Sequence, residues 1–238
     1  MFSGDRRGQR EGVELVSTIT LAVLDLAGTT VADDGLVVEA FTRAMARQGV
    51  EPGSPEYRDM MAHVQRTMGE SKIAVFRHLT GGDEARAQRA NADFEVAYGE
   101  LVDDGRCAPI DGAAATIDAL RTRGVKVALT TGFSRTTQDR ILTALGWRDI
   151  ADLTLCPAEA GRGRPYPDLV LTAVLRLGID DVRTVATAGD TTYDVHSGLR
   201  AGASLVAGVL TGAHDRQTLA DAGATHLLDT VRDLPDLI

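Results

Sequence analysis

The sequence predicts an α/β protein with a parallel β-sheet and an inserted all-helical segment. Short, mostly apolar runs rich in branched residues alternate with helical patterns over most of the chain, which is typical of buried parallel strands. Polar clusters follow the ends of several strands, where open α/β sheets bind ligands. Between residues 35 and 107 the patterns are helical only. These observations predict a core of residues 1–34 and 108–238 and a helical cap domain of residues 35–107.

The first strand is predicted over Ile19–Leu24, and it ends in Asp25 and a sharp turn at Gly28. The inserted segment then shows apolar residues at helical spacing, with Ser54-Pro55 and Asp83 as helix starts. Its helices are expected from Leu36 to Met45, from Pro55 to about Met68, from Lys72 to Leu79 and from Asp83 to about Leu101. The two connections to the core are expected near residues 33–35 and 104–109.

From Pro109 onward, strands and helices alternate again. Gly124 and Gly178 end two of the helices, a common position for glycine. Strands separated by helices imply a parallel sheet with right-handed crossovers. The expected strands are Val125–Thr130, Leu153–Leu155, Thr184–Ala188, Ser204–Val209 and His226–Leu228, and the expected helices are Ala113–Arg123, Arg135–Leu145, Pro167–Leu177 and Tyr193–Ala201.

Composition and charge narrow the functional classes. Of the 238 residues 44% are hydrophobic, enough for a sizeable core, and the net charge of −9 argues against non-specific binding to nucleic acid. No apolar run approaches the roughly 18 residues of a membrane span, and Met1–Gly12 is expected to be a flexible lead-in rather than a secretory signal. Cys107 and Cys156 form no disulfide framework. We therefore expect a cytoplasmic protein with reduced cysteines.

Four polar clusters occupy strand ends or loops in the order carboxylate, hydroxyls, basic loop and carboxylate pair. Asp25, at the end of the first strand, is the candidate nucleophile of this set. Asp190 and Asp194 lie one helical turn apart, so stabilisation of a helix N-terminus is their alternative role.

Together the four clusters resemble the motif set of the haloacid dehalogenase-like (HAD) hydrolases, from about Ile19 to the C-terminus. The resemblance implies a three-layer, Rossmann-like α/β core, in which the Asp25 carboxylate attacks phosphorus and splits one difficult displacement into two easier ones. The carboxylate and the phosphoryl group are both anions, and Mg²⁺ suits their approach because it takes oxygen ligands and bridges to phosphoryl oxygens. It also implies a Mg²⁺ site formed by the side chains of Asp25, Asp190 and Asp194 and the backbone carbonyl of Ala27. Thr131 and the N–H of Gly132 would hold a phosphoryl oxygen, and Arg164 would neutralise the phosphoryl group through a planar, bidentate fork. Arg162 is expected to be solvated.

The residue at position 27 points to one branch of this superfamily. HAD phosphatases normally carry a second Asp there, which protonates the leaving oxygen, whereas this chain has Ala27. Phosphonatases share the alanine, and residues 25–31, 130–132 and 163–167 resemble theirs closely. Their chemistry breaks a carbon–phosphorus bond through an iminium on a cap lysine. No oxygen then has to be protonated, so the second Asp is dispensable.

Lys72 is the candidate Schiff-base residue, because Met68-Gly-Glu-Ser-Lys72 resembles the Met-Gly-x-x-Lys segment of phosphonatases. To act as an amine near neutral pH it needs a lowered pKa, from burial or from nearby cations. The alternative is an ordinary surface lysine in a first helical turn. The chain departs from phosphonatases where they have His, Tyr and Cys, because its residues there are Val75, Phe133 and Leu36.

Three functions remain open. The first is a Mg²⁺-dependent, phosphonatase-like hydrolase of a small β-carbonyl phosphonate such as phosphonoacetaldehyde, acting through an aspartyl-phosphate and a Lys72 Schiff base. The second is a phosphatase for small phosphate esters, such as phosphoglycolate. The third is a non-catalytic protein that binds a phosphorylated metabolite. The intact residues of the four clusters argue against it, namely Asp25, Arg164, Asp190 and Asp194. The resemblance also implies a homodimer through the cap, with apolar contacts from Met60, Met61 and Met68.

Overall fold

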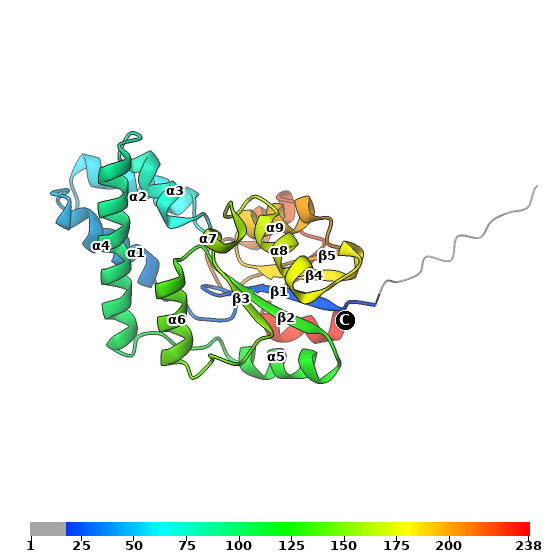
Figure 1. The fold of residues 1–238 in the computed structure, drawn as a ribbon. Coiled ribbons are helices and arrows are strands. Elements are labelled where there is room, and N and C mark those ends of the chain that lie inside the picture. The colour runs from blue at the N-terminus through cyan, green and yellow to red at the C-terminus, as the bar shows by residue number, and fades with distance from the viewer. Residues whose placement is uncertain (1–17) are drawn as a thin grey trace, which may run out of the picture.

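The structure is a computed structural model that describes residues 18–238 (Figure 1). Its sheet has six parallel strands in the order β3-β2-β1-β4-β5-β6. The strands are β1 (Leu21–Asp25), β2 (Lys126–Thr130), β3 (Leu153–Leu155), β4 (Val185–Gly189), β5 (Leu205–Val209) and β6 (His226–Leu228). The predicted α/β fold with a parallel sheet is therefore confirmed, and strand ends differ from the expected ones by at most two residues.

Four helices lie between β1 and α5, and we call them the cap helices. They are α1 (Leu36–Arg47), α2 (Pro55–Arg66), α3 (Lys72–Leu79) and α4 (Glu84–Asp103). The remaining helices are α5 (Ala113–Thr122), α6 (Arg135–Ala144), α7 (Pro157–Ala160), α8 (Asp168–Leu177), α9 (Thr192–Ala201) and α10 (Arg216–Asp221), with the 3₁₀ helices η1 (Val182–Thr184) and η2 (Val231–Leu237). We did not expect α7, α10, η1 or η2, because one or two turns are too short to show a helical period.

Helices cover both faces of the sheet, so the core has three layers (Figure 1). Leu21 and Val23 of β1 pack against apolar side chains of α8 on one face. Ala22 and Leu24 point to the other face, in the apolar cluster that includes side chains of α5, α6 and η2. Because successive strand residues face opposite sides, a strand buried on both faces has to be apolar throughout. This explains the continuous apolar run before Asp25.

The cap helices lie beyond the carboxyl end of β1 (Figure 1). Phe94 of α4 lies in the middle of the apolar contacts between these helices. Its ring centroid is 4.7 Å from that of Phe41 and 6.0 Å from that of Phe76. The two connections to the sheet run side by side: the Ala32 N–H donates to the Ala108 carbonyl over 2.9 Å. A narrow, paired connection is compatible with a cap that moves as a unit. The division into a core of residues 1–34 and 108–238 and a cap of residues 35–107 stays a prediction.

Helix α4 also packs against α6 of the core. The Glu95 carboxylate accepts a hydrogen bond from the Thr137 hydroxyl over 2.6 Å, and the Arg140 Nε donates to Asp103 over 2.9 Å. Phe133, which precedes α6, lies with its ring centroid 4.6 Å from that of Tyr98. These contacts join the cap helices to the segment that follows β2.

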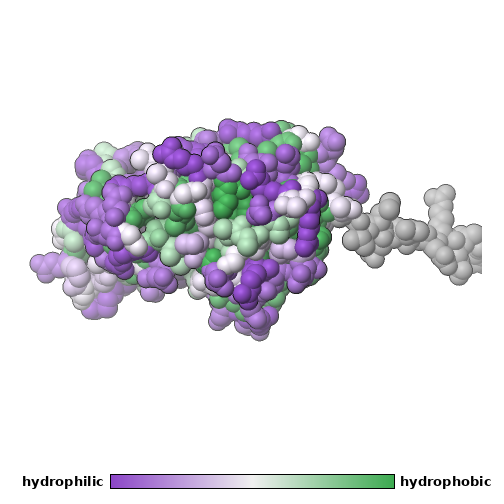
Figure 2. Space-filling view, turned by 90° about the horizontal axis from the view of Figure 1, so that it is seen from below, coloured by the Kyte–Doolittle hydropathy of each residue, from purple (hydrophilic) through white to green (hydrophobic). Residues whose placement is uncertain are grey.

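Other expectations concern the chain ends and the surface. The lead-in at Met1–Gly12 lies outside the described residues, and between residues 18 and 238 no helix combines the length and apolar character of a membrane span. Figure 2 shows hydrophilic residues over much of one face, with apolar patches between them. Met61 is 7% exposed and belongs to the apolar core, so our expectation that it supplies a dimer contact is wrong. Met60 and Met68 are half-buried.

Candidate active site

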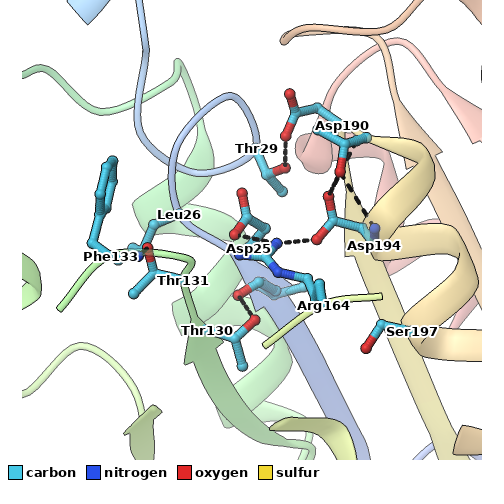
Figure 3. Close-up of polar contacts among 12 residues, drawn as sticks. Asp25, Leu26, Thr29, Thr130, Thr131, Phe133, Arg164, Asp190, Asp194 and Ser197 are labelled. Carbon is cyan, nitrogen blue, oxygen red and sulfur yellow. Dashed lines mark hydrogen bonds and ion pairs between the residues drawn. The ribbon is translucent and has the colours of Figure 1, made fainter. Parts of the chain in front are cut away.

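Three buried carboxylates meet at the carboxyl ends of β1 and β4, on either side of the point where the order of the strands reverses. Asp25 ends β1, Asp190 directly follows β4, and Asp194 lies in the first turn of α9. One oxygen atom of each lies within 4.8 Å of the other two (Figure 3). The structure therefore brings together the three acidic residues that the sequence singled out.

The loop after β1 approaches Asp190 closely because of Gly28. Its φ is 87°, and a Cβ at this position would lie 2.4 Å from a carboxylate oxygen of Asp190. Glycine removes both the backbone strain and the clash. The Leu26 carbonyl accepts hydrogen bonds from three successive N–H groups, at 3.2, 2.9 and 2.8 Å, and so holds the turn tightly.

Hydroxyl and amide groups fix the carboxylates. The Thr29 hydroxyl donates to Asp190 Oδ1 over 3.2 Å (Figure 3). The Ala213 N–H donates to Asp190 Oδ2 over 2.7 Å. The Thr30 hydroxyl donates to the backbone carbonyl of Asp25 over 2.8 Å. Thr29 and Thr30 thus support the site through hydrogen bonds to Asp190 and to the backbone of Asp25.

Arg164 lies between two of the carboxylates (Figure 3). Its Nη1 atom is 2.6 Å from Asp25 Oδ1 and also pairs with Asp194. Arg164 is 5% exposed, and within residues 18–238 its Nε has no hydrogen-bond partner. A buried guanidinium with an unused donor beside the candidate nucleophile suits a phosphoryl oxygen. Arg162 is exposed, as expected, and pairs with Asp168 over 2.7 Å.

Asp194 performs two tasks. It pairs with Arg164, and its Oδ2 accepts hydrogen bonds from the N–H and the hydroxyl of Thr191, over 3.1 and 2.5 Å. Thr191 is the N-cap of α9, so these bonds form a capping box. The helix-terminus role that we considered for Asp194 is therefore present together with its place in the carboxylate cluster.

Thr131 and Gly132 follow β2 and line the same cavity as Asp25. The Thr131 hydroxyl oxygen accepts the Phe133 N–H over 3.2 Å, which leaves the hydroxyl proton free to donate. Both residues therefore share the pocket with Asp25, and their role in binding a phosphoryl oxygen stays a prediction.

The carboxylate cluster fits a divalent cation. Burial raises the pKa of Asp25 to about 7, although the Arg164 guanidinium lowers it. Burial also raises the pKa of Asp190 well above its usual range, and the charges of Asp25 and Asp194 raise it further. Three buried acidic groups repel one another when ionised, and Arg164 pairs with only two of them, Asp25 and Asp194. An oxygen-only donor set of this kind matches the preference of Mg²⁺.

A pocket of about 460 Å³ opens over the cluster, and both the core and the cap helices line it. Its core side includes Asp25, Ala27, Thr131, Gly132, Arg164 and Asp190. Its cap side includes Val37, Val38, Gln65, Met68, Gly69 and Lys72. The predicted phosphate-binding groups and the predicted Schiff-base residue therefore share one pocket, although they lie far apart in the sequence.

Lys72 is not a surface lysine. It is the first residue of α3, is 6% exposed, and its Nζ lies 5.3 Å from the ring centroid of Phe133 and 5.9 Å from that of Phe41. Burial lowers its pKa to about 8. Within residues 18–238 its Nζ makes no hydrogen bond or ion pair. The chain has only one other lysine, Lys126, although it has 25 Lys and Arg residues together.

The loop between α2 and α3 rests directly on the phosphate-binding segment. The Lys72 N–H donates to the Gly132 carbonyl over 3.3 Å. A Cβ at Gly132 would lie 2.8 Å from the Glu70 carbonyl oxygen, and a Cβ at Gly69 would lie 2.3 Å from the Thr191 hydroxyl. Glycine at both positions thus allows the cap loop to close on the core.

The residues that depart from phosphonatases differ in their surroundings. Val75 and Leu36 are buried in the apolar core, whereas Phe133 lines the pocket. Our sequence interpretation missed Asp33, which lines the pocket beside Lys72 and which we treated only as part of a connection. The sequence did contain an indication of this position, because two acidic residues and a glycine directly precede the first cap helix.

Residues 19–202 match the sequence model of the haloacid dehalogenase-like hydrolases, so this chain belongs to that family and is a hydrolase. Among curated proteins, it is similar to the phosphonoacetaldehyde hydrolase of Bacillus cereus, with 30% identity over 212 residues that cover 83% of this chain and 78% of the relative. The phosphonoacetaldehyde hydrolase of Nitratidesulfovibrio vulgaris is 29% identical over 205 residues, which cover 82% of this chain and 72% of the relative.

The fold also resembles solved structures. A phosphonoacetaldehyde hydrolase-like protein from Oleispira antarctica superposes with a TM-score of 0.80 at 24% identity, covering 93% of this chain and 92% of its own. A hydrolase from Pseudomonas syringae superposes with a TM-score of 0.78 at 23% identity, covering 91% of this chain and 96% of its own. These likenesses support the fold.

Proposed function

We propose that this chain is a Mg²⁺-dependent, phosphonatase-like hydrolase that cleaves the carbon–phosphorus bond of a small β-carbonyl phosphonate. The observation that carries the proposal is Lys72, a buried amine with a pKa of about 8 in the same pocket as Asp25. Position 27, where HAD phosphatases carry the aspartic acid that protonates the leaving oxygen, is an alanine in this chain. A site with an amine and without that acid suits a carbonyl substrate better than a phosphate ester. The phosphonoacetaldehyde hydrolase relatives support this substrate class.

In the proposed reaction, Lys72 condenses with the substrate carbonyl and water leaves, which produces an iminium. Asp25 attacks phosphorus, and the electron pair of the breaking carbon–phosphorus bond moves toward the iminium nitrogen to give an enamine. Water then hydrolyses the aspartyl-phosphate, and hydrolysis of the enamine releases the carbonyl product. Each difficult step is thus divided into easier ones by a covalent intermediate.

The remaining residues bind and orient the phosphoryl group. Arg164 contacts Asp25 and offers its unused donors to phosphoryl oxygens, together with the Thr131 hydroxyl and the Gly132 N–H. Asp25, Asp190 and the Ala27 carbonyl would hold Mg²⁺, with Asp194 beside them. When bound, Mg²⁺ supplies the positive charge that allows a carboxylate to approach a phosphoryl group.

The test is phosphate release from phosphonoacetaldehyde compared with a panel of phosphate esters that includes phosphoglycolate. We expect the wild-type chain to favour the phosphonate, and Lys72→Arg to lose phosphonate turnover by at least about 1,000-fold, because a guanidinium forms no imine at working pH. Asp25→Asn should be inactive on every substrate. Borohydride added with the phosphonate should leave an adduct on Lys72, detected by mass spectrometry.

The phosphatase is the second candidate, and the apolar character of Val75, Phe133 and Leu36 favours it, since polar groups that would assist imine formation are missing. Faster turnover of an ester than of the phosphonate, with full activity in Lys72→Arg, would establish this function instead. Tight binding of a phosphorylated metabolite without turnover would identify a binding protein.

A further inference from the structure

Lys72 is buried, and within the described residues its Nζ has no direct partner, yet four charged groups act on its pKa. These are the carboxylates of Asp33, Asp25 and Asp190 and the guanidinium of Arg164. Asp25 pairs with Arg164, and both oxygens of Asp190 accept hydrogen bonds from the core. Asp33 is the remaining carboxylate of these three, and among these charges it has the largest effect on the pKa of Lys72. The Glu70 carboxylate also interacts with Lys72, but Glu70 does not line the pocket.

Asp33 is held in place by its own backbone segment. It lies on the connection between the core and α1, where its Oδ1 accepts the Val37 N–H over 3.1 Å and its carbonyl accepts the Leu36 N–H over 2.7 Å. It lines the pocket that also contains Lys72 and Asp25. The first turn of α1 therefore orients a carboxylate toward the pocket from the cap side.

We propose that Asp33 is the proton-transfer partner of Lys72 in imine formation. The inference rests on the function proposed above and names the group that replaces the polar residues absent at Val75, Phe133 and Leu36. The rings of Phe41 and Phe133 flank the Lys72 amine and restrict solvent around it. Asp33, a carboxylate in the same pocket, can therefore exchange protons with this amine.

The step balances without an external acid or base. The Asp33 carboxylate takes a proton from the Lys72 ammonium, and the neutral amine adds to the carbonyl carbon while the carbonyl electron pair moves to oxygen. A proton passes from nitrogen to that oxygen, which gives a carbinolamine. Protonated Asp33 returns its proton to the hydroxyl group, the carbon–oxygen bond breaks and water leaves. An iminium cation then faces the Asp33 carboxylate.

The pKa values of Asp33 and Lys72 are shifted in directions that suit this proton exchange. Burial raises the pKa of its carboxyl group, while burial lowers that of Lys72, so the two groups come closer in proton affinity than their ordinary values allow. The neighbouring Asp34 carboxylate raises the pKa of Asp33, and Lys72 lowers it. General acid–base catalysis of this kind contributes about 100- to 10,000-fold to a rate.

The experiment compares the wild-type chain with Asp33→Asn, Asp33→Ser and Asp83→Asn. Asn and Ser both keep an oxygen for the Val37 N–H, so α1 retains its N-terminal acceptor. Asp83 is the matched control, because its carboxylate also accepts an N–H at a helix start, that of Arg86 over 3.0 Å, but it is exposed and does not line the pocket. Melting temperatures establish that each variant is folded.

The first measurement titrates Lys72 itself. Reductive methylation with formaldehyde and cyanoborohydride is followed by mass spectrometry from pH 6 to 10, with Lys126, whose side chain is 53% exposed, as the internal reference. We expect both Asp33 variants to move the midpoint for Lys72 to lower pH, because a facing negative charge has been removed. Asp83→Asn should not move it. An unchanged midpoint in both Asp33 variants would overturn the inference, whatever the substrate is.

The second measurement is the rate at which borohydride traps the Lys72 adduct with phosphonoacetaldehyde at pH 7. The Asp33 variants should trap at least about 100-fold more slowly than the wild type, and Asp83→Asn at the wild-type rate. Wild-type trapping rates in both Asp33 variants would also overturn the inference. Absence of any wild-type adduct would refute the proposed function and, with it, the proton-transfer role of Asp33, whereas slow trapping confined to the Asp33 variants would support both.

Discussion

At the scale of single residues, the two lysines of the chain, Lys72 and Lys126, have opposite surroundings. Lys126 lies at the surface and pairs with Asp152 over 3.4 Å, whereas Lys72 is enclosed by aromatic rings and makes no ion pair within the described residues. Burying a cation in this way favours its neutral form. The burial that lowers the pKa of this amine therefore also destabilises the folded state.

This cost gives a prediction for Lys72→Met. The pKa of Lys72 falls from 10.5 to about 8 on folding, so the folded state binds this proton more weakly than the unfolded state. The penalty is present in full below about pH 8 and disappears as the pH rises toward 10.5. We expect Lys72→Met to be more stable than the wild type at pH 7 by about 1–3 kcal/mol, with the difference shrinking above pH 8.

Urea unfolding of both proteins from pH 6 to 10 measures this difference. A Lys126→Met variant is the control, because that side chain is 53% exposed and its removal should change stability little at any pH. Equal stability of Lys72→Met and the wild type at pH 7 would show that Lys72 carries no desolvation penalty.

At the scale of structural elements, the α2–α3 loop and the segment after β2 close the pocket by contact between backbones. Gly132 faces the Glu70 carbonyl, and Gly163 packs against Ser71 of the same loop. This loop leads directly into Lys72, so its position on the core also sets the position of the amine. Closure of such a lid excludes water and completes the catalytic groups.

We therefore predict that Gly132→Ala reduces activity more than stability. The added Cβ would lie 2.8 Å from the Glu70 carbonyl oxygen, and overpacking of this kind costs about 1–3 kcal/mol. If the loop yields by lifting from the core, kcat/KM for the phosphonate falls roughly 10- to 100-fold while the melting temperature changes little. Steady-state kinetics and thermal unfolding measure the two effects.

Gly124→Ala is the contrasting variant. Its φ is 83° and no atom lies within 4 Å of the added Cβ, so it should lose stability through backbone strain and keep its activity. Wild-type kinetics in Gly132→Ala would mean that seating of the α2–α3 loop does not govern catalysis.

At the scale of the whole molecule, the carboxylate cluster joins segments that are distant in sequence. Asp25 ends β1, Arg164 lies between β3 and β4, and Asp190 follows β4. A cation bound by this cluster would stabilise the folded chain, because the unfolded chain has no assembled site. Mutual repulsion of the buried carboxylates makes the effect larger where they are ionised.

We expect Mg²⁺ at about 100 times its dissociation constant to raise the melting temperature by roughly 5–10 °C at pH 7.5. Differential scanning fluorimetry with a Mg²⁺ titration and with EDTA measures the shift. Asp190→Asn should abolish it, because it removes a charged ligand, and Asp34→Asn should retain it. A shift that survives in Asp190→Asn would place the cation elsewhere.

The order of strands and helices was predictable because local periodicity and spacing encode it. The apolar run that ends at Asp25, the serine and proline before α2 and the glycine after α8 each act within one or two turns of the chain. The candidate carboxylates were predictable for a related reason: parallel strands carry their ends to one edge of the sheet. The short α7 and α10 left no comparable pattern.

The tertiary structure alone decided which groups face one another. Nothing in the local pattern distinguishes the buried Lys72 from a surface lysine, because its burial comes from Phe133, a residue 61 positions away. Met61 belongs to the apolar core rather than to the surface, and Asp33 lies in the pocket rather than in a passive connection. Burial and charge pairing depend on distances across the fold, and a linear pattern of residue types does not contain those distances.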